Sequence, residues 1–362
     1  MKNTFGQSIT VTLFGESHGA EIGAVIDGIA PGIKIDFEYI DKKLSLRRPS
    51  GRISTARCEK DEYRILSGVF NGYTTGTPIA VTIPNGDTRC CDYKAFSETP
   101  RPSHADYTAE CKYHGFQDFR GGGHFSGRIT APIVLVGAIL ESALLKKGIR
   151  IATHISYLGG IHDLPIESEE DIERLGEIPF PTVSDEAAKK MVEKIEEVRG
   201  RGDSIGGILE SVIVGLPSGI GEPYFDSIES TLSHALFSIP GIKGVEFGAG
   251  FGFANMTGSE ANDPFTVKDG KVITKTNNNG GINGGISNGM PIVFRCAVKP
   301  TPSISMEQTT VNLSKMTEEK ISIVGRHDPA IIHRARAVVD ATAAIAVADM
   351  LVSRHGTDWL KD

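Results

Sequence analysis

Two stretches of the chain decide the expected fold, GESHGAEIGAVIDGIAPGI at residues 15–33 and GDSIGGILESVIVGLPSGI at residues 202–220. Aligned without a gap at an offset of 187, they share eight of nineteen residues. A helix-like pattern follows each copy. Because glycine is abundant in this chain, chance similarity is the alternative interpretation. We favour an internal duplication that yields two similar halves, about 1–180 and 181–362.

Outward from these stretches, apolar residues recur with the spacings of strands and of helices, without a regular alternation of the two. Strand-like runs cover residues 9–14, 23–26, 149–154, 207–214 and 292–298, and helical patterns cover 131–147, 184–198, 226–238 and 329–355. Ser184, Asp226 and Asp328 are the expected N-caps of the last three helices, because their side chains can accept hydrogen bonds from free backbone N–H groups. No Pro/Ser-rich linker interrupts the chain, so we expect one α+β domain over residues 1–362.

The composition excludes several classes of protein. The 38 Lys and Arg residues against 45 Asp and Glu give a formal net charge of −7, which argues against a nucleic-acid partner. The 42 glycines, about 12% of the chain against a usual ~7%, indicate many turns and a close approach of the backbone to a ligand. No apolar run reaches the ~20 residues of a membrane helix, and the first residues lack the apolar core of a signal peptide. We therefore expect a cytoplasmic protein with no membrane partner. Its five cysteines form no CxxC motif, which favours reduced thiols and no metal site.

Two early motifs carry candidate binding chemistry. His18 lies in FGESHG, where flanking glycines would turn the backbone and present the imidazole to a cavity; a histidine bonded to the turn backbone is the alternative. Arg47, Arg48 and Arg52 cluster in a turn-rich stretch, and the forked guanidinium matches phosphate and carboxylate geometry. So dense a cluster in an acidic chain favours an anion site over a solvated surface patch.

Two glycine-rich segments follow. RPSHADY at residues 101–107 leads into RGGGHFSGR at 120–128, where three glycines before a helix could offer backbone N–H groups to an anion. His104 in this segment is either a titrating acid or base or a simple turn residue. NNNGGINGGIS at 277–287 precedes a strand that ends in KPTPS at 299–303. It is either a flexible surface loop or a cradle for a phosphate or a heterocycle.

A last motif, GRHDP, opens the C-terminal helical pattern. Asp328 would cap that helix and Pro329 would occupy its first position, where a missing N–H costs nothing. Arg326 and His327 beside the cap indicate a second, functional use.

Taken together, these motifs resemble the chorismate synthase family. The resemblance rests on FGESHG, RRP, RPSHADY, RGGG, GDSIGG, GGINGGISNG, KPTPS and GRHDP, which occur in family order from Gly6 to beyond Asp328. It implies a β-α-β sandwich assembled as a homotetramer. It also implies a lyase that converts 5-enolpyruvylshikimate 3-phosphate to chorismate and phosphate by 1,4-anti elimination, the last common step of aromatic amino acid biosynthesis in the shikimate pathway. Reduced FMN is required without net redox change, so an external NADPH-dependent reductase would supply it.

The resemblance also implies roles for individual residues. His18 would be the acid near the departing phosphate, His104 would protonate reduced flavin near N1, and Asp328 would relay a proton from flavin N5. Substrate would be bound by Arg47, Arg48, Arg52 and Arg128. Flavin would be contacted by His124, Phe125, Ser126, Gly284, Lys299, Pro300, Thr301, Pro302, Ser303 and Arg326.

The chain departs from the common family pattern at two places. His124-Phe125-Ser126 stands where many members carry Arg-Ser-Ser or Arg-Ala-Ser, so one flavin-facing cation is lost. Many members have a polar residue where Pro240 stands, and we assign no flavin contact to Pro240 or Gly241.

Two other functions stay open on the sequence alone. The first is a flavin oxidoreductase acting on a phosphorylated substrate, although no GxGxxG follows a strand to hold a dinucleotide. The second is a non-catalytic module that binds a phosphometabolite or RNA, and the acidic balance and few aromatics disfavour RNA. The chemistry of the arginines supports the family assignment independently, because a substrate with a phosphate and two carboxylates requires several cations.

Overall fold

The structure is a computed structural model that describes residues 2–49, 51, 53–54, 61–86, 98–323 and 328–361. Every strand pairing within these ranges is antiparallel, and helices alternate with groups of strands along the chain. The mixture of helices and sheets expected from the sequence is confirmed.

Two five-stranded sheets form the frame. The first has the order β1-β2-β3-β7-β4 and consists of Thr4–Phe5, Thr10–Gly15, Glu21–Asp27, Ile79–Pro84 and Arg64–Ile65. The second has the order β11-β16-β10-β8-β9 and consists of Ile242–Phe247, Ile292–Val298, Gly207–Val214, Arg150–Leu158 and Ile161–His162. In β3 the side chains of Ile22, Ala24 and Ile26 are fully buried, as the two-residue period of a strand predicts for one face.

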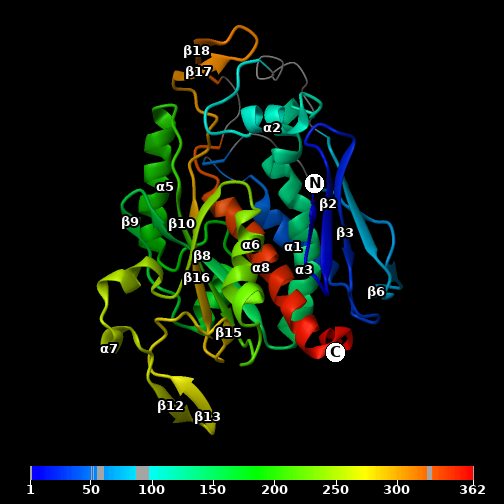
Figure 1. The fold of residues 1–362 in the computed structure, drawn as a ribbon, viewed down its shortest axis with the longest axis vertical. Helices are drawn as coiled ribbons and strands as arrows, with labels where there is room; N and C mark the ends of the chain where they lie inside the picture. Colours follow the sequence, from blue (N-terminus) through cyan, green and yellow to red (C-terminus); the bar gives the residue numbers. More distant parts are fainter. Residues whose placement is uncertain are drawn as a thin grey trace.

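A layer of helices lies between the two sheets (Figure 1), with β2 and β3 on one side and β8, β10 and β16 on the other. It is formed by α1 (Phe37–Arg47), α3 (Thr130–Lys146), α6 (Ile228–Phe237) and α8 (Ile332–His355). Shorter helices lie outside this layer: α2 (Asp106–Tyr113), α4 (Glu169–Leu175), α5 (Asp185–Gly200) and α7 (Gly258–Ala261). Four small hairpins complete the described part: β5/β6 (Val69–Phe70, Tyr73–Thr74), β12/β13 (Phe265–Lys268, Lys271–Thr274), β14/β15 (Ile282–Asn283, Ile286–Ser287) and β17/β18 (Gln308–Asn312, Thr317–Ile321).

The two central helices, α3 and α8, pack against each other over much of their length. Small residues allow this approach, because a Cβ on Gly137 would lie 2.4 Å from the Cβ of Ala341. The segment Gly127–Lys146 is long and apolar enough to span a membrane, with a mean hydropathy of 1.8, but 89% of it is buried inside the protein. Burial of this kind is typical of a core helix.

The structure confirms most of the expected elements and corrects two caps. Ser184 caps α5, and its Oγ accepts a hydrogen bond from the Ala187 N–H at 3.3 Å. The N-cap of α6 is Ser227 rather than Asp226, and its Oγ accepts from the Ser230 N–H at 3.1 Å. Asp226 instead ends the short 3₁₀ turn Tyr224–Asp226.

The second correction concerns the start of α8, which begins at Ile332 and not at Pro329. The carbonyl of Pro329 accepts a hydrogen bond from the Ile205 N–H at 2.8 Å, so this backbone pairs with another segment before the helix starts. Asp328 is therefore not an N-cap, and its carboxylate contacts Arg334 instead.

Candidate active site

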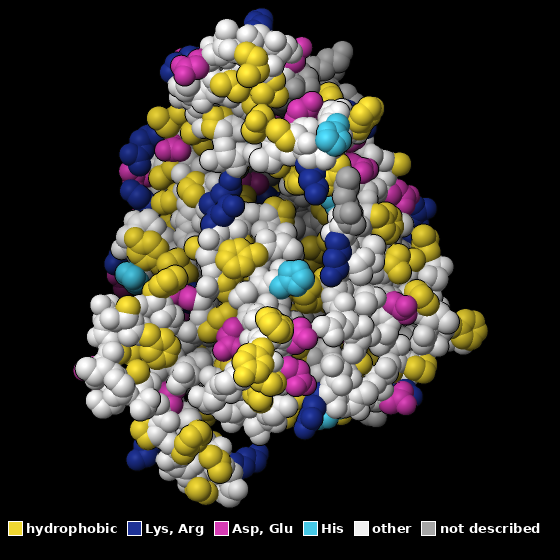
Figure 2. All heavy atoms as spheres, viewed as in Figure 1, with side chains coloured by type: hydrophobic (Ala, Val, Ile, Leu, Met, Phe, Trp, Pro, Cys, Tyr) yellow, Lys and Arg dark blue, Asp and Glu magenta, His cyan; other side chains and the backbone are white. Residues whose placement is uncertain are grey.

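A cleft of about 1080 Å³ opens beside the helical layer and draws its walls from distant parts of the chain. Strands β1 and β2, the segment before α2, the end of α6, residues 299–303 and the start of α8 all contribute to its lining. The space-filling view shows this face hollowed, with Lys and Arg side chains around the hollow (Figure 2).

The cleft collects most of the site residues expected from the sequence. Those that line it are Arg47, His104, His124, Phe125, Ser126, Arg128, Lys299, Pro300, Thr301, Pro302, Ser303 and Asp328. Pro240 and Gly241, for which the sequence predicts no flavin contact, line it as well. Arg52 and Arg326 lie outside the described residues.

Three expected residues lie elsewhere. Gly284 occupies the turn of the β14/β15 hairpin and is not part of the cleft lining. Arg48 lines a neighbouring cavity, which shares Asp61 with the cleft. His18 is 6% exposed and packs against Gly121, which belongs to the cleft lining and to the glycine turn 121–123.

This glycine turn, Gly121–Gly123, runs between the two candidate histidines. A Cβ on Gly121 would lie 2.1 Å from the His18 ring, and one on Gly122 would lie 3.4 Å from Cε1 of His104. The φ angles of the three glycines are 61°, 82° and 53°, a backbone region that side chains disfavour. The positive φ angles favour glycine at all three positions, and an added Cβ would also collide with His18 at Gly121 and with the Asp118 carbonyl at Gly123.

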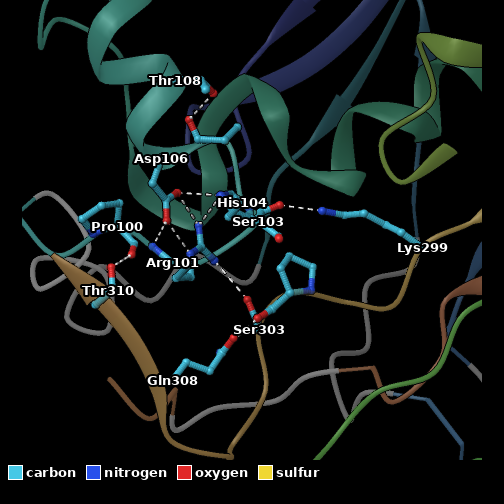
Figure 3. Close-up of polar contacts among 12 residues, drawn as sticks. Pro100, Arg101, Ser103, His104, Asp106, Thr108, Lys299, Ser303, Gln308 and Thr310 are labelled. Carbon is cyan, nitrogen blue, oxygen red and sulfur yellow. Dashed lines mark hydrogen bonds and ion pairs between the residues drawn. The ribbon is translucent and has the colours of Figure 1, made fainter. Parts of the chain in front are cut away.

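His104 belongs to a cluster with Arg101 and Asp106 (Figure 3). Its Nδ1 lies 2.6 Å from Asp106 Oδ1, and Arg101 donates from Nε to Oδ2 and from Nη2 to Oδ1 of Asp106, each at 2.8 Å. Burial alone would raise the pKa of Asp106, but the hydrogen bonds from Arg101 and His104 outweigh it and hold that pKa well below its usual value. Asp106 is therefore a carboxylate at neutral pH.

The segment 299–303 is fastened to this cluster. Lys299 Nζ donates to the Ser103 carbonyl at 2.5 Å, and Arg101 Nη1 donates to Ser303 Oγ at 3.3 Å (Figure 3). Burial, together with the nearby charge of Lys243, lowers the pKa of Lys299. The wall formed by residues 299–303 and the turn that carries His104 thus form one connected unit.

The basic side of the cleft is organised by a buried carboxylate. Asp61 Oδ2 lies 2.8 Å from Arg47 Nη2, and Asp61 Oδ1 pairs with Arg128 Nη1. Burial raises the pKa of Asp61, but the two guanidinium groups oppose this effect and the net shift is downward. Two guanidinium groups thus meet at one carboxylate of the lining, and their forked donors suit the oxygens of an anionic ligand.

Asp328 is held by an arginine from α8. Arg334 Nη1 lies 2.6 Å from Asp328 Oδ2, and Arg334 Nε donates to the carbonyl of Arg47 at 2.8 Å. Arg334 therefore links the carboxylate of Asp328 to the C-terminal end of α1.

Sequence reasoning missed the residues that hold the predicted ones. Asp61, Asp106 and Arg334 each pair with a predicted residue, and each comes from a different segment of the chain. Asp106 and Arg101 had a usable signal, since both stand inside the RPSHADY motif. Asp61 had none, because its partners are 14 and 67 residues away.

The cleft also offers groups that suit a flavin. Its volume exceeds that of a typical drug-sized pocket, and Phe125 and Ile331 add apolar surface to the lining. Thr301 Oγ1 is buried and has no hydrogen-bond partner among the described residues, although it belongs to the lining. Lys299 and Ser303 supply a cation and a hydroxyl for a phosphate or an anionic ring.

Comparison with known proteins gives a consistent result. Residues 9–352 match the protein family described as chorismate synthase. Chorismate synthase of Pyrococcus abyssi is 50% identical over 350 residues, which cover 97% of this chain and 98% of the relative. Chorismate synthase of Aeropyrum pernix is 43% identical over 365 residues, which cover 100% and 96%. A solved structure described as a crystal structure of chorismate synthase has a TM-score of 0.76 and 29% identity, and the match covers 98% of this chain and 94% of that one.

Proposed function

The chain belongs to the chorismate synthase family of shikimate-pathway lyases, and from this premise we propose that it converts 5-enolpyruvylshikimate 3-phosphate to chorismate and phosphate by 1,4-anti elimination with reduced FMN. The observation that carries the proposal is one cleft that combines paired arginines with His104 and Asp328. Elimination of phosphate needs cations for the substrate and proton carriers at both ends of the reaction.

Arg47 and Arg128 would bind anionic groups of the substrate, with Arg48 and Arg52 as further proposed ligands. The Asp61 carboxylate fixes the two guanidinium groups before substrate arrives, which reduces the entropy lost on binding. Because the substrate carries a phosphate and two carboxylates, its oxygens suit the forked donors of these guanidinium groups.

His18 would act as the acid beside the departing phosphate. Breaking the C–O bond places negative charge on the leaving oxygen, and an imidazolium would stabilise that charge. Because His18 is buried and packs against Gly121, its ring has little room to move. The imidazole is therefore held in position before the reaction.

Reduced FMN would be held by the 299–303 wall, Arg326 and the 124–126 segment, with Thr301 Oγ1 as a hydrogen-bonding group that has no partner in the described part of the chain. When bound, reduced FMN supplies the electron-rich, basic chemistry that a carboxylate alone lacks for an unactivated C–H bond. His104 would hold a proton on one side of this site, and Asp328, oriented by Arg334, would accept a proton on the other. Gly284 also stays a proposed flavin contact, although its hairpin lies outside the cleft lining.

An anaerobic assay with photoreduced FMN tests the function. We expect phosphate and chorismate to form in equal amounts from 5-enolpyruvylshikimate 3-phosphate, without consumption of an added NADPH equivalent for each turnover. Oxidation of one NADPH per product would instead indicate a flavin oxidoreductase. Absence of phosphate release with substrate and reduced FMN both bound would favour a non-catalytic binding module.

Three properties of the family complete the proposal: a homotetramer, a cytoplasmic location and an external NADPH-dependent reductase. Large exposed apolar side chains such as Phe116 and Phe225, each 93% exposed, support burial against further subunits. Light scattering of the purified protein would distinguish a tetramer from a monomer.

We also infer that the two halves arose by duplication. The order β2-β3-α1-β7-α3 matches β8-β10-α6-β16-α8, and the central pairs β2/β3 and β8/β10 are both antiparallel. The aligned glycines Gly28 and Gly215 both have positive φ, at 88° and 80°, and each ends a strand of the repeat. This correspondence favours a junction after α3, near residue 148, over one near residue 180.

A further inference from the structure

Asp106 contacts both the imidazole of His104 and the guanidinium of Arg101, two groups that line the cleft (Figure 3). The side chains of Arg101, His104 and Asp106 are 7%, 18% and 10% exposed. Water therefore screens their interactions weakly, and the geometry of the hydrogen bonds determines where protons reside.

The distances identify the nitrogen of His104 that carries a proton. Nδ1 lies 2.6 Å from Asp106 Oδ1 and 3.0 Å from Arg101 Nη2. A bare Nδ1 would bring its lone pair against a carboxylate oxygen at 2.6 Å, which is repulsive, whereas Nδ1–H donates a charge-assisted hydrogen bond. Arg101 Nη2 has its own acceptor in Asp106 Oδ1 at 2.8 Å, so it does not need Nδ1.

We propose that Asp106 and Arg101 are positioning residues that hold His104 as the Nδ1–H tautomer, so that Nε2 is the atom that exchanges protons with a ligand. The imidazolium releases the Nε2 proton to the ligand and becomes a neutral ring that keeps its Nδ1–H. Asp106 stays ionised throughout, because two side-chain hydrogen bonds and the backbone N–H of Arg101 at 3.0 Å all favour the carboxylate.

The glycine turn leaves room beside this nitrogen. The Cβ position of Gly122 lies 3.5 Å from Nε2, so a side chain there would cover the ring edge that faces away from Asp106. The consequence for turnover rests on the proposed function, whereas the tautomer is a property of the protein alone.

Nitrogen NMR of the full-length, ligand-free protein labelled with ¹⁵N-histidine tests the proposal. The His104 signals are assigned by their loss in His104→Gln, and the shifts of a neutral ring distinguish a protonated nitrogen from a bare one. We expect the Nδ1–H tautomer in the wild type. A wild-type ring with a bare Nδ1 overturns the proposal without any need for a variant.

Asp106→Asn sharpens the test. The N–H and Nε of Arg101 both donate to Oδ2, so the amide oxygen should take that position and the amide NH₂ should face Nδ1. His104 should then change to the Nε2–H tautomer, and kcat should fall roughly a hundredfold or more, the size of a lost acid–base contribution. An unchanged tautomer in Asp106→Asn also overturns the proposal.

Asp163→Asn is the matched control, because Asp163 pairs with His154 Nδ1 at 2.8 Å outside the cleft. It should change the signals of His154 and leave those of His104 and the value of kcat unchanged. A tautomer change in Asp106→Asn with full activity would support the positioning role and contradict only the part proposed for His104 in turnover.

Discussion

Asp328 has a different structural role from the helix cap that its neighbours in the sequence predict. It contacts Arg334 at 2.6 Å and does not cap α8, so its loss removes an ion pair at the cleft rather than a helix cap. The side chains of Asp328 and Arg334 are 14% and 17% exposed, so part of the ion-pair energy is retained against solvent screening.

We therefore predict that Asp328→Asn abolishes turnover and lowers the free energy of unfolding by about 1–3 kcal/mol, the contribution of a hydrogen bond to a charged group. The amide can still accept a hydrogen bond from Arg334 but cannot take up a proton. Phosphate release and thermal unfolding of the same preparation check both parts. Glu246→Gln is the control, since Glu246 pairs with Arg295 at 2.9 Å and does not line the cleft. Normal turnover in Asp328→Asn would contradict the catalytic role.

His124 gives a second prediction at the residue scale. Its Nδ1 donates to the Gly15 carbonyl at 2.8 Å, so the only N–H of a neutral ring with this tautomer is already in use. An arginine carries five donors and a permanent charge, and a hydrogen bond from a charged group contributes about 1.5–3 kcal/mol against about 0.5–1.5 for a neutral one.

His124→Arg should accordingly tighten the binding of reduced FMN by up to roughly tenfold. Anaerobic titration of both proteins with reduced FMN, with and without substrate, measures the difference. Because charge is the cause, the gain should shrink as salt is raised. Unchanged or weaker affinity at low salt would mean that position 124 does not face the charged part of the flavin.

At the scale of elements, the glycine turn at 121–123 is a test of how His18 is placed. Gly121→Ala adds a methyl group 2.1 Å from the His18 ring at a φ of 61°, so the ring or the turn must move. We expect a loss of most of the activity and a destabilisation of at least about 1 kcal/mol. Gly200→Ala, where the added Cβ meets nothing within 4 Å, should leave activity unchanged.

Elements were the most predictable level of this fold. The strands at 207–214 and 292–298 have the bounds that the sequence predicts, because alternating burial leaves a direct trace in the pattern of apolar residues. The predicted N-caps of α6 and α8 are wrong. For α8, a capping rule based on neighbouring residues cannot detect the hydrogen bond from Ile205 to Pro329 or the ion pair of Asp328 with Arg334. The motifs likewise indicated which residues reach the cleft but not the carboxylates that hold them, because those contacts depend on the folded chain.

At the scale of the whole molecule, stability should depend on pH through a histidine outside the catalytic set. His333 is 2% exposed, stacks on Phe180 and lies 2.8 Å from Ser54 Oγ through Nε2. Burial, followed by the charge of Arg334, lowers the pKa of His333 to about 4. Below the ordinary histidine pKa of about 6.5, the unfolded chain binds a proton that the folded protein does not, so stability falls as pH falls.

We predict that this histidine costs the fold about 2 kcal/mol at pH 5 relative to pH 8. Calorimetry of the wild type and of His333→Gln over this range checks the value. The melting temperature of the variant should fall less steeply with decreasing pH, because glutamine does not titrate. Parallel curves for the two proteins would mean that folding does not change the pKa of His333, and would contradict the prediction.

The tight contact of Gly137 with Ala341 bears on how relatives of this chain can be recombined. A chimera joined after α3 would take α3 from one parent and α8 from the other. This contact would then lie at the interface between the two parental parts. A parent with alanine at position 137 and a parent with valine at position 341 could each fold. In the chimera, the larger side chains at these two positions would clash. If α3 and α8 are exchanged as a pair, with the crossovers elsewhere, the two packed helix surfaces come from the same parent.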